Sequence, residues 1–535
     1  MKRLLPAIAL VLVTIGQQSW RAQSSAPVYD VVIRGGHVLD GAGNPWIAAD
    51  VAIKGDTIVA VAPALAGKGA REIDATGLMV SPGFIDIHTH ARRGIFEVPT
   101  ADNYVRQGVT TLFEGPDGSS PVPIKGFLDR IEATKITPNW ATFIGQGSVR
   151  EAVMGRVNRP ATPEEIEKMK GLVRAGMREG AFGLSSGLVY VPGVYTPAAE
   201  VEALGAVAGA MGGMYQSHMR NEAAGILESV RETIAVGEKG RMPTQITHHK
   251  IIGTGNWGKS VETLRLVAEA RARGVDVTID QYPYTASATS ISVLLPPWAL
   301  EGTNAQVVAR LKDPALRARM KPEIVESMRL ERGGGDAKNV SISFCVWDPK
   351  LAGKNLADIT RARGAEPTLE NAAETVLWIV EQGGAQGIFH AIDEADLERI
   401  LKAPETMVAS DGEVCVFGQA SPHPRSYGTF VRVLGRYVRE RHVITLADAV
   451  RRMTSLPAWR AGLQDRGIIR TGMKADIAIW DADRIGDTAT YEQPHQYATG
   501  VSRVIVNGQV VFADGQMTPA RPGRVLHGPA FVPSK

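Results

Sequence analysis

Two histidines separated by one residue follow an apolar run near the start of the chain. The run covers residues 81–87, and His88 and His90 come directly after it. Because successive side chains of a strand point to opposite faces, His88 and His90 leave the same face and can converge on one cation. Imidazole nitrogen is a common ligand of zinc and other transition metals. The spacing predicts the start of a metal site, with a hydrogen-bonded histidine pair as the alternative.

Four further strand-like runs end in residues that bind metals or move protons. These residues are Glu114 and Asp117 after the run 109–114, His218 after 213–217, His248 after 243–247, and Asp411 after 406–410. Such a recurrence is not expected by chance, so we expect these side chains to surround one site. His249 follows His248 and faces the opposite way along a strand, which predicts a packed or hydrogen-bonded histidine.

The segments that carry these residues alternate between strand and helix patterns. One helix is expected to begin with Thr162 as its cap and Pro163 in its first turn. The strand-like runs lie near residues 83–90, 109–114, 139–145, 181–186, 213–218, 243–248, 276–282 and 406–411. This alternation predicts the α/β class and a (β/α)8 TIM-like barrel, in which site residues gather at the carboxyl ends of the strands. An open doubly wound sheet is the alternative, but its site would lie at one switch point.

The two flanks of the barrel have another pattern. Residues 28–80 and 466–525 contain short runs separated by glycines, which predicts a small split β-sandwich domain built from both chain ends. The barrel then occupies residues 81–465. Its stretch 286–388 is too long for an ordinary loop, so we expect an inserted lid or subdomain over the site. A passive surface insertion is the alternative.

The first 25 residues have the layout of a secretory signal peptide. Lys2 and Arg3 precede an apolar run, residues 4–16, which is too short to span a bilayer. We therefore expect an exported protein, periplasmic or secreted, with no membrane span after cleavage. An uncleaved N-terminal anchor is the alternative. The formal net charge is +3, and the leader carries three basic residues and no acidic one, so the mature chain is near neutral.

The composition excludes several classes of protein. The chain has 535 residues, 44% of them hydrophobic and 21% charged, which is typical of a globular protein and not of a disordered one. It has no basic stripe or aromatic stacking platform, so we expect no nucleic-acid partner. Cys345 and Cys415 form no zinc or redox motif. In an exported protein they could pair, or they could be structural or free thiols.

Several segments in order resemble the amidohydrolase superfamily and, within it, the N-acyl-D-amino-acid deacylases (D-aminoacylases). These segments are residues 83–90, 217–222, 247–250, 280–284, 409–412 and 423–425. The resemblance covers residues 28–525 and implies a barrel flanked by a split β domain, with a site for zinc, as one or two divalent ions per chain. It implies that His88, His90, His218 and His248 are metal ligands, that Asp411 is catalytic, and that Lys250, Tyr282 and Arg425 hold the substrate carboxylate.

The chain departs from these deacylases at one metal ligand. They place a cysteine thiolate after the second strand, where this chain has Asp117 at the aligned position and Glu114 three residues earlier. Many amidohydrolases use a carboxylated lysine of the fourth strand as a bridge, but residues 181–187 contain no lysine. We therefore expect Glu114 or Asp117 to supply an oxygen ligand, which zinc accepts. A turn or cap role is the alternative, since Pro-Asp-Gly is a common turn sequence.

The expected chemistry is hydrolysis of an amide bond. Bound zinc brings the pKa of its water to about 7, so hydroxide becomes available to attack the acyl carbonyl. Asp411 would take the proton as a general base and return it to the departing amine as a general acid. The expected substrate is a small carboxylate-bearing amide such as an N-acyl-D-amino acid.

Three alternatives to this interpretation stay open. The same site could serve a dipeptidase or a cyclic amide or lactam hydrolase, because one site serves many substrates within a fold. A non-catalytic metal-binding protein is less favoured, since binding alone requires no general base. Arg425 could pair with a protein carboxylate in place of a substrate carboxylate. The sequence indicates no particular oligomeric state.

Overall fold

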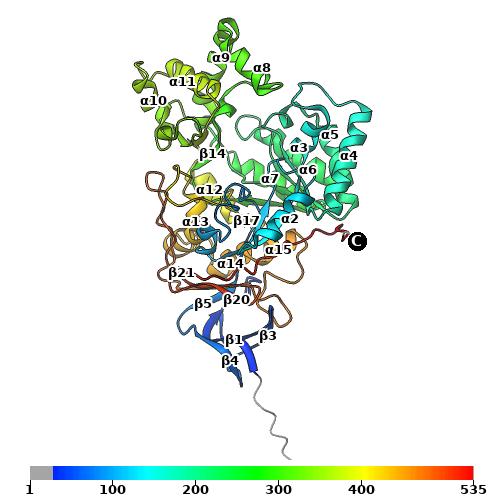
Figure 1. The fold of residues 1–535 in the computed structure, drawn as a ribbon, viewed down its shortest axis with the longest axis vertical. Helices are drawn as coiled ribbons and strands as arrows, with labels where there is room; N and C mark the ends of the chain where they lie inside the picture. The colour runs from blue at the N-terminus through cyan, green and yellow to red at the C-terminus, as the bar shows by residue number, and fades with distance from the viewer. Residues whose placement is uncertain (1–27, 534–535) are drawn as a thin grey trace, which may run out of the picture.

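The computed structural model describes residues 28–533, so the predicted signal peptide, residues 1–25, lies outside the described residues. The molecule has a β domain at one end, a barrel in the middle and an inserted subdomain at the other end (Figure 1). Within residues 28–533, no helix is both long enough and apolar enough to cross a bilayer.

Eight parallel strands form the barrel. They are β6 (Phe84–Asp86), β7 (Val109–Glu114), β8 with β9 (Asn139–Thr142 and Ile144–Gly145, one strand interrupted at Phe143), β10 (Gly183–Gly187), β11 (Met214–His218), β12 (Thr244–Ile246), β13 (Val277–Gln281) and β17 (Thr406–Val408). The ring closes just beyond β6 and β17, where Asp411 N donates to His88 O at 2.9 Å and His90 N donates to Gly412 O at 2.7 Å. The predicted (β/α)8 barrel is confirmed.

Helices cover the outside of the barrel and connect its strands. They are α1 (Asp102–Val105), α2 (Lys125–Thr134), α3 (Gln146–Met154), α4 (Pro163–Arg178), α5 (Ala198–Ala210), α6 (Ile226–Gly240), α7 (Ser260–Ala272), α12 (Glu394–Lys402), α13 (Arg425–Arg432), α14 (Leu446–Met453) and α15 (Ser455–Arg460), with the short 3-10 helices η1 (Gly193–Tyr195) and η2 (Thr254–Asn256) and the π-helix η8 (Val433–Glu440), which continues α13. Helix α4 begins as predicted, because Thr162 and Glu165 form a capping box and Pro163 occupies the first turn.

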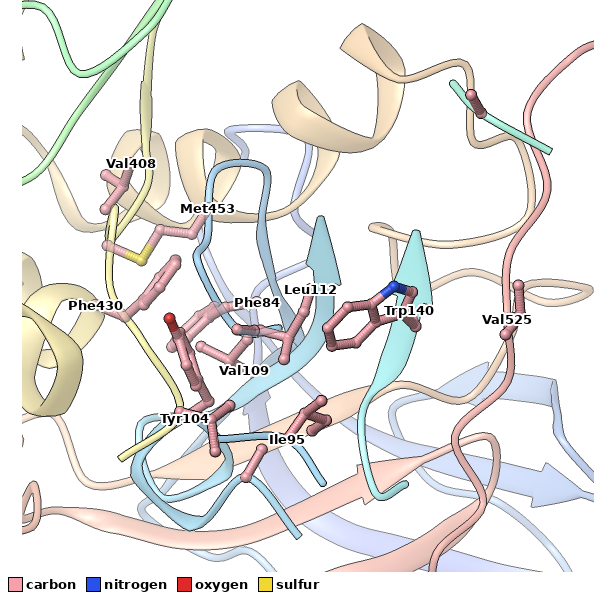
Figure 2. Close-up of a cluster of buried hydrophobic side chains, with 14 of the residues drawn as sticks. Phe84, Ile95, Tyr104, Val109, Leu112, Trp140, Val408, Phe430, Met453 and Val525 are labelled. Carbon is pink, nitrogen blue, oxygen red and sulfur yellow. The ribbon is translucent and has the colours of Figure 1, made fainter. Parts of the chain in front are cut away.

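An apolar cluster fixes the barrel strands that carry the first candidate ligands. Phe84 of β6, Leu112 of β7 and Trp140 of β8 are completely buried in it, together with Phe430 of α13 (Figure 2). The Phe84 and Phe430 rings stack with centroids 5.7 Å apart. Because interiors pack densely, this cluster leaves the strands little freedom to shift, and the residues beyond their carboxyl ends are held accordingly.

Both chain ends contribute to one β domain. Its strands are β1 (Val28–Val38), β2 (Ile47–Lys54), β3 (Thr57–Ala62), β4 (Lys68–Asp74) and β5 (Met79–Pro82) from the first flank, and β18 (Ile477–Trp480), β19 (Val501–Val506), β20 (Gln509–Ala513) and β21 (Gln516–Met517) from the second. They form one nine-stranded sheet in which β5 pairs antiparallel with β18. The split β domain predicted from the two flanks is therefore present.

The long segment between β13 and β17 folds as a subdomain. It contains β14 (Ala286–Ser290), η3 (Ile291–Leu294), η4 (Pro297–Leu300), α8 (Asn304–Lys312), α9 (Pro314–Ser327), η5 (Met328–Arg332), η6 (Ala337–Asn339), β15 (Val340–Phe344), η7 (Pro349–Leu351), α10 (Leu356–Ala362), α11 (Leu369–Glu381) and β16 (Gln386–His390). The order β14-β16-β15 makes a small antiparallel sheet. Leu311, Met320, Leu377 and Phe389 belong to its own apolar core.

The free edge of this small sheet lies against the barrel. Ala286 O accepts a hydrogen bond from His423 Nε2 at 3.0 Å, and Ala288 O accepts one from the guanidinium of Arg425 at 3.3 Å. Strand β14 therefore touches the residues that follow the last barrel strand, at the end where the site is expected. Both Cys345, in the subdomain core, and Cys415 are free thiols.

A buried ion pair joins the β domain to the barrel. Asp476, directly before β18, pairs with Arg466. The Asp476 carboxylate also accepts hydrogen bonds from Asn139 Nδ2 of β8 at 3.0 Å and from Asn507 N at 2.7 Å. These four residues are buried. Because a buried charge without a partner is costly, the pair makes the contact between the two domains specific.

We expect Arg466→Met to lower the free energy of unfolding by about 3–5 kcal/mol, because it leaves the Asp476 carboxylate buried without a counter-charge. Urea unfolding followed by tryptophan fluorescence measures the loss. Arg503→Met is the matched control, since Arg503 forms an exposed pair with Asp514 at 3.0 Å and should cost less than about 1 kcal/mol. Equal small losses in both variants would contradict the assigned role of Arg466.

Candidate metal centre and active site

Six side chains converge at the carboxyl ends of the barrel strands, and they form two groups that share Asp117. The first group is His88, His90, Asp117 and Asp411, and the second is Asp117, His218 and His248. Within each group the candidate ligand atoms lie within 4.8 Å of one another. All are buried except His90, which is half-buried. The structure thus brings together six of the residues that the sequence analysis singled out.

Asp117 lies between the two groups and faces all four histidines. Its Oδ1 is 3.5 Å from both His88 Nε2 and His248 Nε2. Its Oδ2 is 3.4 Å from His90 Nε2 and 3.6 Å from His218 Nδ1. Tetrahedral ligands with bonds of about 2.0–2.2 Å to one zinc ion lie roughly 3.4 Å apart. The carboxylate is therefore placed to bridge two cation positions.

Glu114 does not join these groups, which corrects the expectation that it could be the strand-two ligand. Its Oε2 accepts a hydrogen bond from Arg92 N at 2.9 Å, and Oε1 lies 3.7 Å from Arg92 Nε. The side chain is buried against Arg92, at the end of β7, while the following turn carries Asp117 back toward the histidines. Of the two carboxylates, Asp117 is the candidate ligand.

Three of the converging residues have a left-handed backbone. Asp117, His248 and Asp411 have φ values of 54°, 34° and 51°. Non-glycine residues rarely adopt this region, and each such residue costs about 1–3 kcal/mol unless its surroundings impose it. All three follow a barrel strand directly or within a few residues, and the turn directs the side chain to the centre of the barrel mouth.

Strand β10 holds the turn that carries Asp117. The Ser185 hydroxyl donates to Gly115 O at 2.6 Å and accepts from Gly118 N at 3.2 Å. A Cβ atom on Gly187 would lie only 2.1 Å from Asp117 O. The strand that lacks the bridging lysine therefore supplies small residues, which seat the Asp117 turn. The sequence analysis assigned no role to Ser185 or Gly187.

Glu222 orients the two histidines of the second group, a role that the sequence analysis missed. Its Oε1 lies 3.2 Å from His248 Nδ1, and its Oε2 lies 3.6 Å from His218 Nε2, an electrostatic contact longer than a hydrogen bond. Each imidazole therefore turns its other nitrogen to Asp117. Carboxylates that hold metal-ligating histidines in this way fix both the ring and its tautomer.

Lys250 is part of the same network. Its Nζ donates to Glu222 Oε1 at 2.6 Å and lies 2.9 Å from His248 Nδ1. Burial raises the pKa of Glu222, but the charge of Lys250 together with the His218 and His248 imidazoles outweighs this and holds the pKa well below its usual range. Glu222 is therefore ionised. The predicted contact of Lys250 with a substrate carboxylate stays a prediction.

Two neighbouring buried side chains complete the surroundings of the first and second groups. Asp280 Oδ1 accepts from His248 N at 2.7 Å and lies 3.7 Å from His88 Nδ1, so it supports both histidines. His249 points the other way, with Nε2 2.8 Å from the Thr263 hydroxyl, and burial lowers its pKa to about 4. The interpretation of His249 as a packed, hydrogen-bonded histidine is confirmed.

Asp411 is paired on two sides. Its Oδ1 lies 3.1 Å from His90 Nε2, and its Oδ2 lies 2.8 Å from the guanidinium of Arg425. Burial alone would raise the pKa of Asp411. The Arg425 charge and the His90 hydrogen bond lower this pKa by more, so the carboxylate is ionised. Arg425 thus pairs with a protein carboxylate, the alternative left open above. Its guanidinium carbon also lies 4.7 Å from the Tyr282 ring centroid.

The donor set fits a divalent metal. His88 Nε2 and Asp117 Oδ1 are buried and have no hydrogen-bond partner among residues 28–533. Buried polar atoms normally have partners, so these atoms are explained by a ligand that they share. Imidazole nitrogen with carboxylate oxygen suits zinc and neighbouring first-row metals. The hydroxyl of Tyr282 is also buried without a partner in this part of the chain.

Comparison with known proteins agrees with this geometry. The model of the amidohydrolase family matches residues 71–320 and 345–512. The chain belongs to the amidohydrolase family. This amidohydrolase is 34% identical to the N-acyl-D-glutamate deacylase of Alcaligenes xylosoxydans xylosoxydans, over 94% of this chain and 97% of the relative. It is 33% identical to the D-aminoacylase of the same organism, over 94% and 99%.

A solved relative extends the similarity to three dimensions. The N-acyl-D-glutamate deacylase from Bordetella bronchiseptica was determined in complex with zinc and a phosphonate inhibitor that mimics the tetrahedral intermediate. The amidohydrolase superposes on it with a TM-score of 0.81 at 32% identity, covering 94% of this chain and 100% of that chain. The similarity therefore includes the β domain, the barrel and the inserted subdomain.

We expect Asp117→Ala to remove most of the bound metal, because the one carboxylate that faces all four histidines is lost. Glu114→Ala is the matched variant from the same segment and should keep the metal, since Glu114 contacts Arg92. Elemental analysis after dialysis measures the metal content of each protein. Full metal content in the Asp117 variant, or loss in the Glu114 variant, would contradict the assignment.

Replacing Glu222 by glutamine tests whether its carboxylate holds the histidines of the second ligand group in place. The amide keeps the size but loses the charge that holds His218 and His248, so we expect metal affinity to fall about 10- to 100-fold. Competition with a chelating dye measures the affinity. Glu228→Gln, on the exposed side of α6, is the control. An unchanged affinity for the Glu222 variant would mean that the carboxylate does not orient the ligands.

Proposed function

We propose that this amidohydrolase is a zinc-dependent deacylase of N-acyl-D-amino acids. The observation that carries the proposal is the paired ligand group around Asp117, with the ionised Asp411 as a member of the first group. Similarity to curated D-amino-acid deacylases over 94% of the chain supports the same activity. A protein that only binds metal would need neither the ion pair between Asp411 and Arg425 nor the position of Asp411 beside the candidate metal ligands.

The protein's own residues supply the proton transfer and the positioning. Zinc, when bound by the two groups, supplies Lewis acidity toward the amide carbonyl and makes hydroxide available near neutral pH. Asp411 takes the proton of the attacking water and returns it to the nitrogen of the departing amine. Arg425 keeps Asp411 ionised before attack. Glu222 and Asp280 keep the histidines in place.

The substrate carboxylate is assigned to the side chains next to Asp411. Arg425, which pairs with Asp411 through one nitrogen, presents a planar guanidinium that can also contact a substrate carboxylate, and Tyr282 has a buried hydroxyl without a partner within residues 28–533. Both lie close together, with the guanidinium over the Tyr282 ring. Lys250 contributes positive charge from behind His248. This arrangement supports a substrate whose carboxylate is adjacent to the scissile amide.

We also propose that the enzyme is exported. The basic start and apolar run of residues 1–25 support this location. N-terminal sequencing of the protein from fractionated cells tests it, since cleavage near residue 25 and recovery outside the cytoplasm are expected. Recovery of the intact N-terminus in the cytoplasm would overturn it.

We expect the purified, zinc-loaded enzyme to hydrolyse N-acetyl-D-amino acids and to leave their L-enantiomers nearly untouched. Chelation should abolish the activity and zinc should restore it. Asp411→Asn should lower kcat by about 10²- to 10⁴-fold, because the proton acceptor is lost. Release of free amino acid, measured by chromatography with both enantiomers, checks these outcomes.

Two controls make this test decisive. Asp483→Asn, at an exposed position of the C-terminal flank, should keep full activity. Dipeptides and cyclic amides are offered in parallel, because related hydrolases use the same kind of site. Turnover of those compounds without turnover of N-acetyl-D-amino acids would reject the deacylase proposal.

A further inference from the structure

The inserted subdomain presents one face of its sheet to the metal centre. Thr289 of β14 donates a hydrogen bond to the Tyr190 hydroxyl at 3.0 Å, and that hydroxyl lies 3.3 Å from His218 Nδ1. Ser287, two residues before Thr289, shares its face of the strand. Phe389 of β16 lies directly opposite Ser287 and so shares this face as well. Thr289 therefore contacts the surroundings of the site and Ser287 lies on the same face of β14, while Phe389 packs in the apolar core of the subdomain.

Arg332 approaches the same face from the end of η5. Its guanidinium carbon lies 5.7 Å from the Phe389 ring centroid, and only 5% of the residue is exposed. Leu330 O lies 2.0 Å from where a Cβ on Gly253 would be, so η5 sits directly on the barrel loop after β12. Arg332 thus lies against Phe389, the residue paired with Ser287 across the sheet.

Arg332 is a largely buried residue without a counter-charge in the described part of the chain. Within residues 28–533, Arg332 makes no salt bridge within 4.0 Å and no side-chain hydrogen bond although only 5% of the residue is exposed, and the Ser287 hydroxyl is buried without a partner. Contact with the Phe389 ring does not satisfy the five N–H donors of an arginine. Because burying an unpaired charge is costly, such a group is retained where a ligand supplies the missing acceptors.

We propose that Arg332, assisted by Ser287, binds a second carboxylate of the substrate, so that the preferred substrates are N-acyl derivatives of acidic D-amino acids. This inference rests on the proposed deacylase function and adds the class of side chain. The carboxylate next to the scissile amide is already assigned to Arg425 and Tyr282. Overall similarity does not choose among substrates, since identity to the D-aminoacylase and to the N-acyl-D-glutamate deacylase differs by one percentage point.

The test compares substrates of matched size that differ in one charge. For the wild-type enzyme, kcat/KM should be about 10- to 100-fold higher for N-acetyl-D-glutamate than for N-acetyl-D-glutamine, as expected for hydrogen bonds to a charged group. Arg332→Met should bring the ratio of the two kcat/KM values close to one. Arg332→Lys should give an intermediate ratio, because lysine keeps the positive charge but lacks the two parallel donors of a guanidinium. Arg363→Met, an exposed arginine of the same subdomain stacked on Trp378, should keep the wild-type ratio.

Each outcome bears on a separate claim. A wild-type ratio near one, or a ratio that Arg332→Met leaves unchanged in a folded protein with full metal content, would overturn the inference while the deacylase function stands. No turnover of either compound would reject the proposed function itself. N-succinyl-D-alanine tests the other source of a second carboxylate, the acyl group. A preference for it over N-acetyl-D-glutamate would overturn the assignment to the amino-acid side chain.

Discussion

The site depends on one carboxylate placed among four imidazoles. Asp117 reaches His88, His90, His218 and His248 at distances between 3.4 and 3.6 Å, so removal of this group would leave the two halves of the site without a common member. A turn that carries such a residue must be both strained and well supported. The left-handed backbone of Asp117 gives the direction, and Ser185 with Gly187 on the neighbouring strand supplies the support.

A second layer of charge stabilises this arrangement. Glu222 contacts the distal nitrogens of two histidines and is itself neutralised by Lys250. On the opposite side, Arg425 neutralises Asp411. Positive groups therefore flank the carboxylates from behind, which keeps them ionised in a buried place where burial alone would favour their protonated forms.

Much of the site could be predicted from the sequence because the barrel imposes a simple rule. Residues after apolar strands gather at one mouth, so His218 and His248 were recognisable without knowledge of their contacts. The choice between Glu114 and Asp117 was not predictable, because it depends on a positive φ angle and on contacts with β10, some 70 residues later. Glu222 was missed because its partners come from two different strands. Arg425 was ambiguous because one guanidinium fork serves protein and substrate carboxylates alike.

The inserted subdomain enters and leaves the barrel through two adjacent strands. Ala286 at the start of β14 lies opposite His390 at the end of β16, so the chain returns to the barrel almost where it left. An insertion whose two ends lie close together can be replaced as a unit, because the distance between its attachment points on the barrel is the same for any inserted segment. None of the six converging residues lies between these ends. The metal centre and the inserted subdomain are thus encoded in separate stretches of the gene, and the insertion can change by recombination without altering any of the six converging residues.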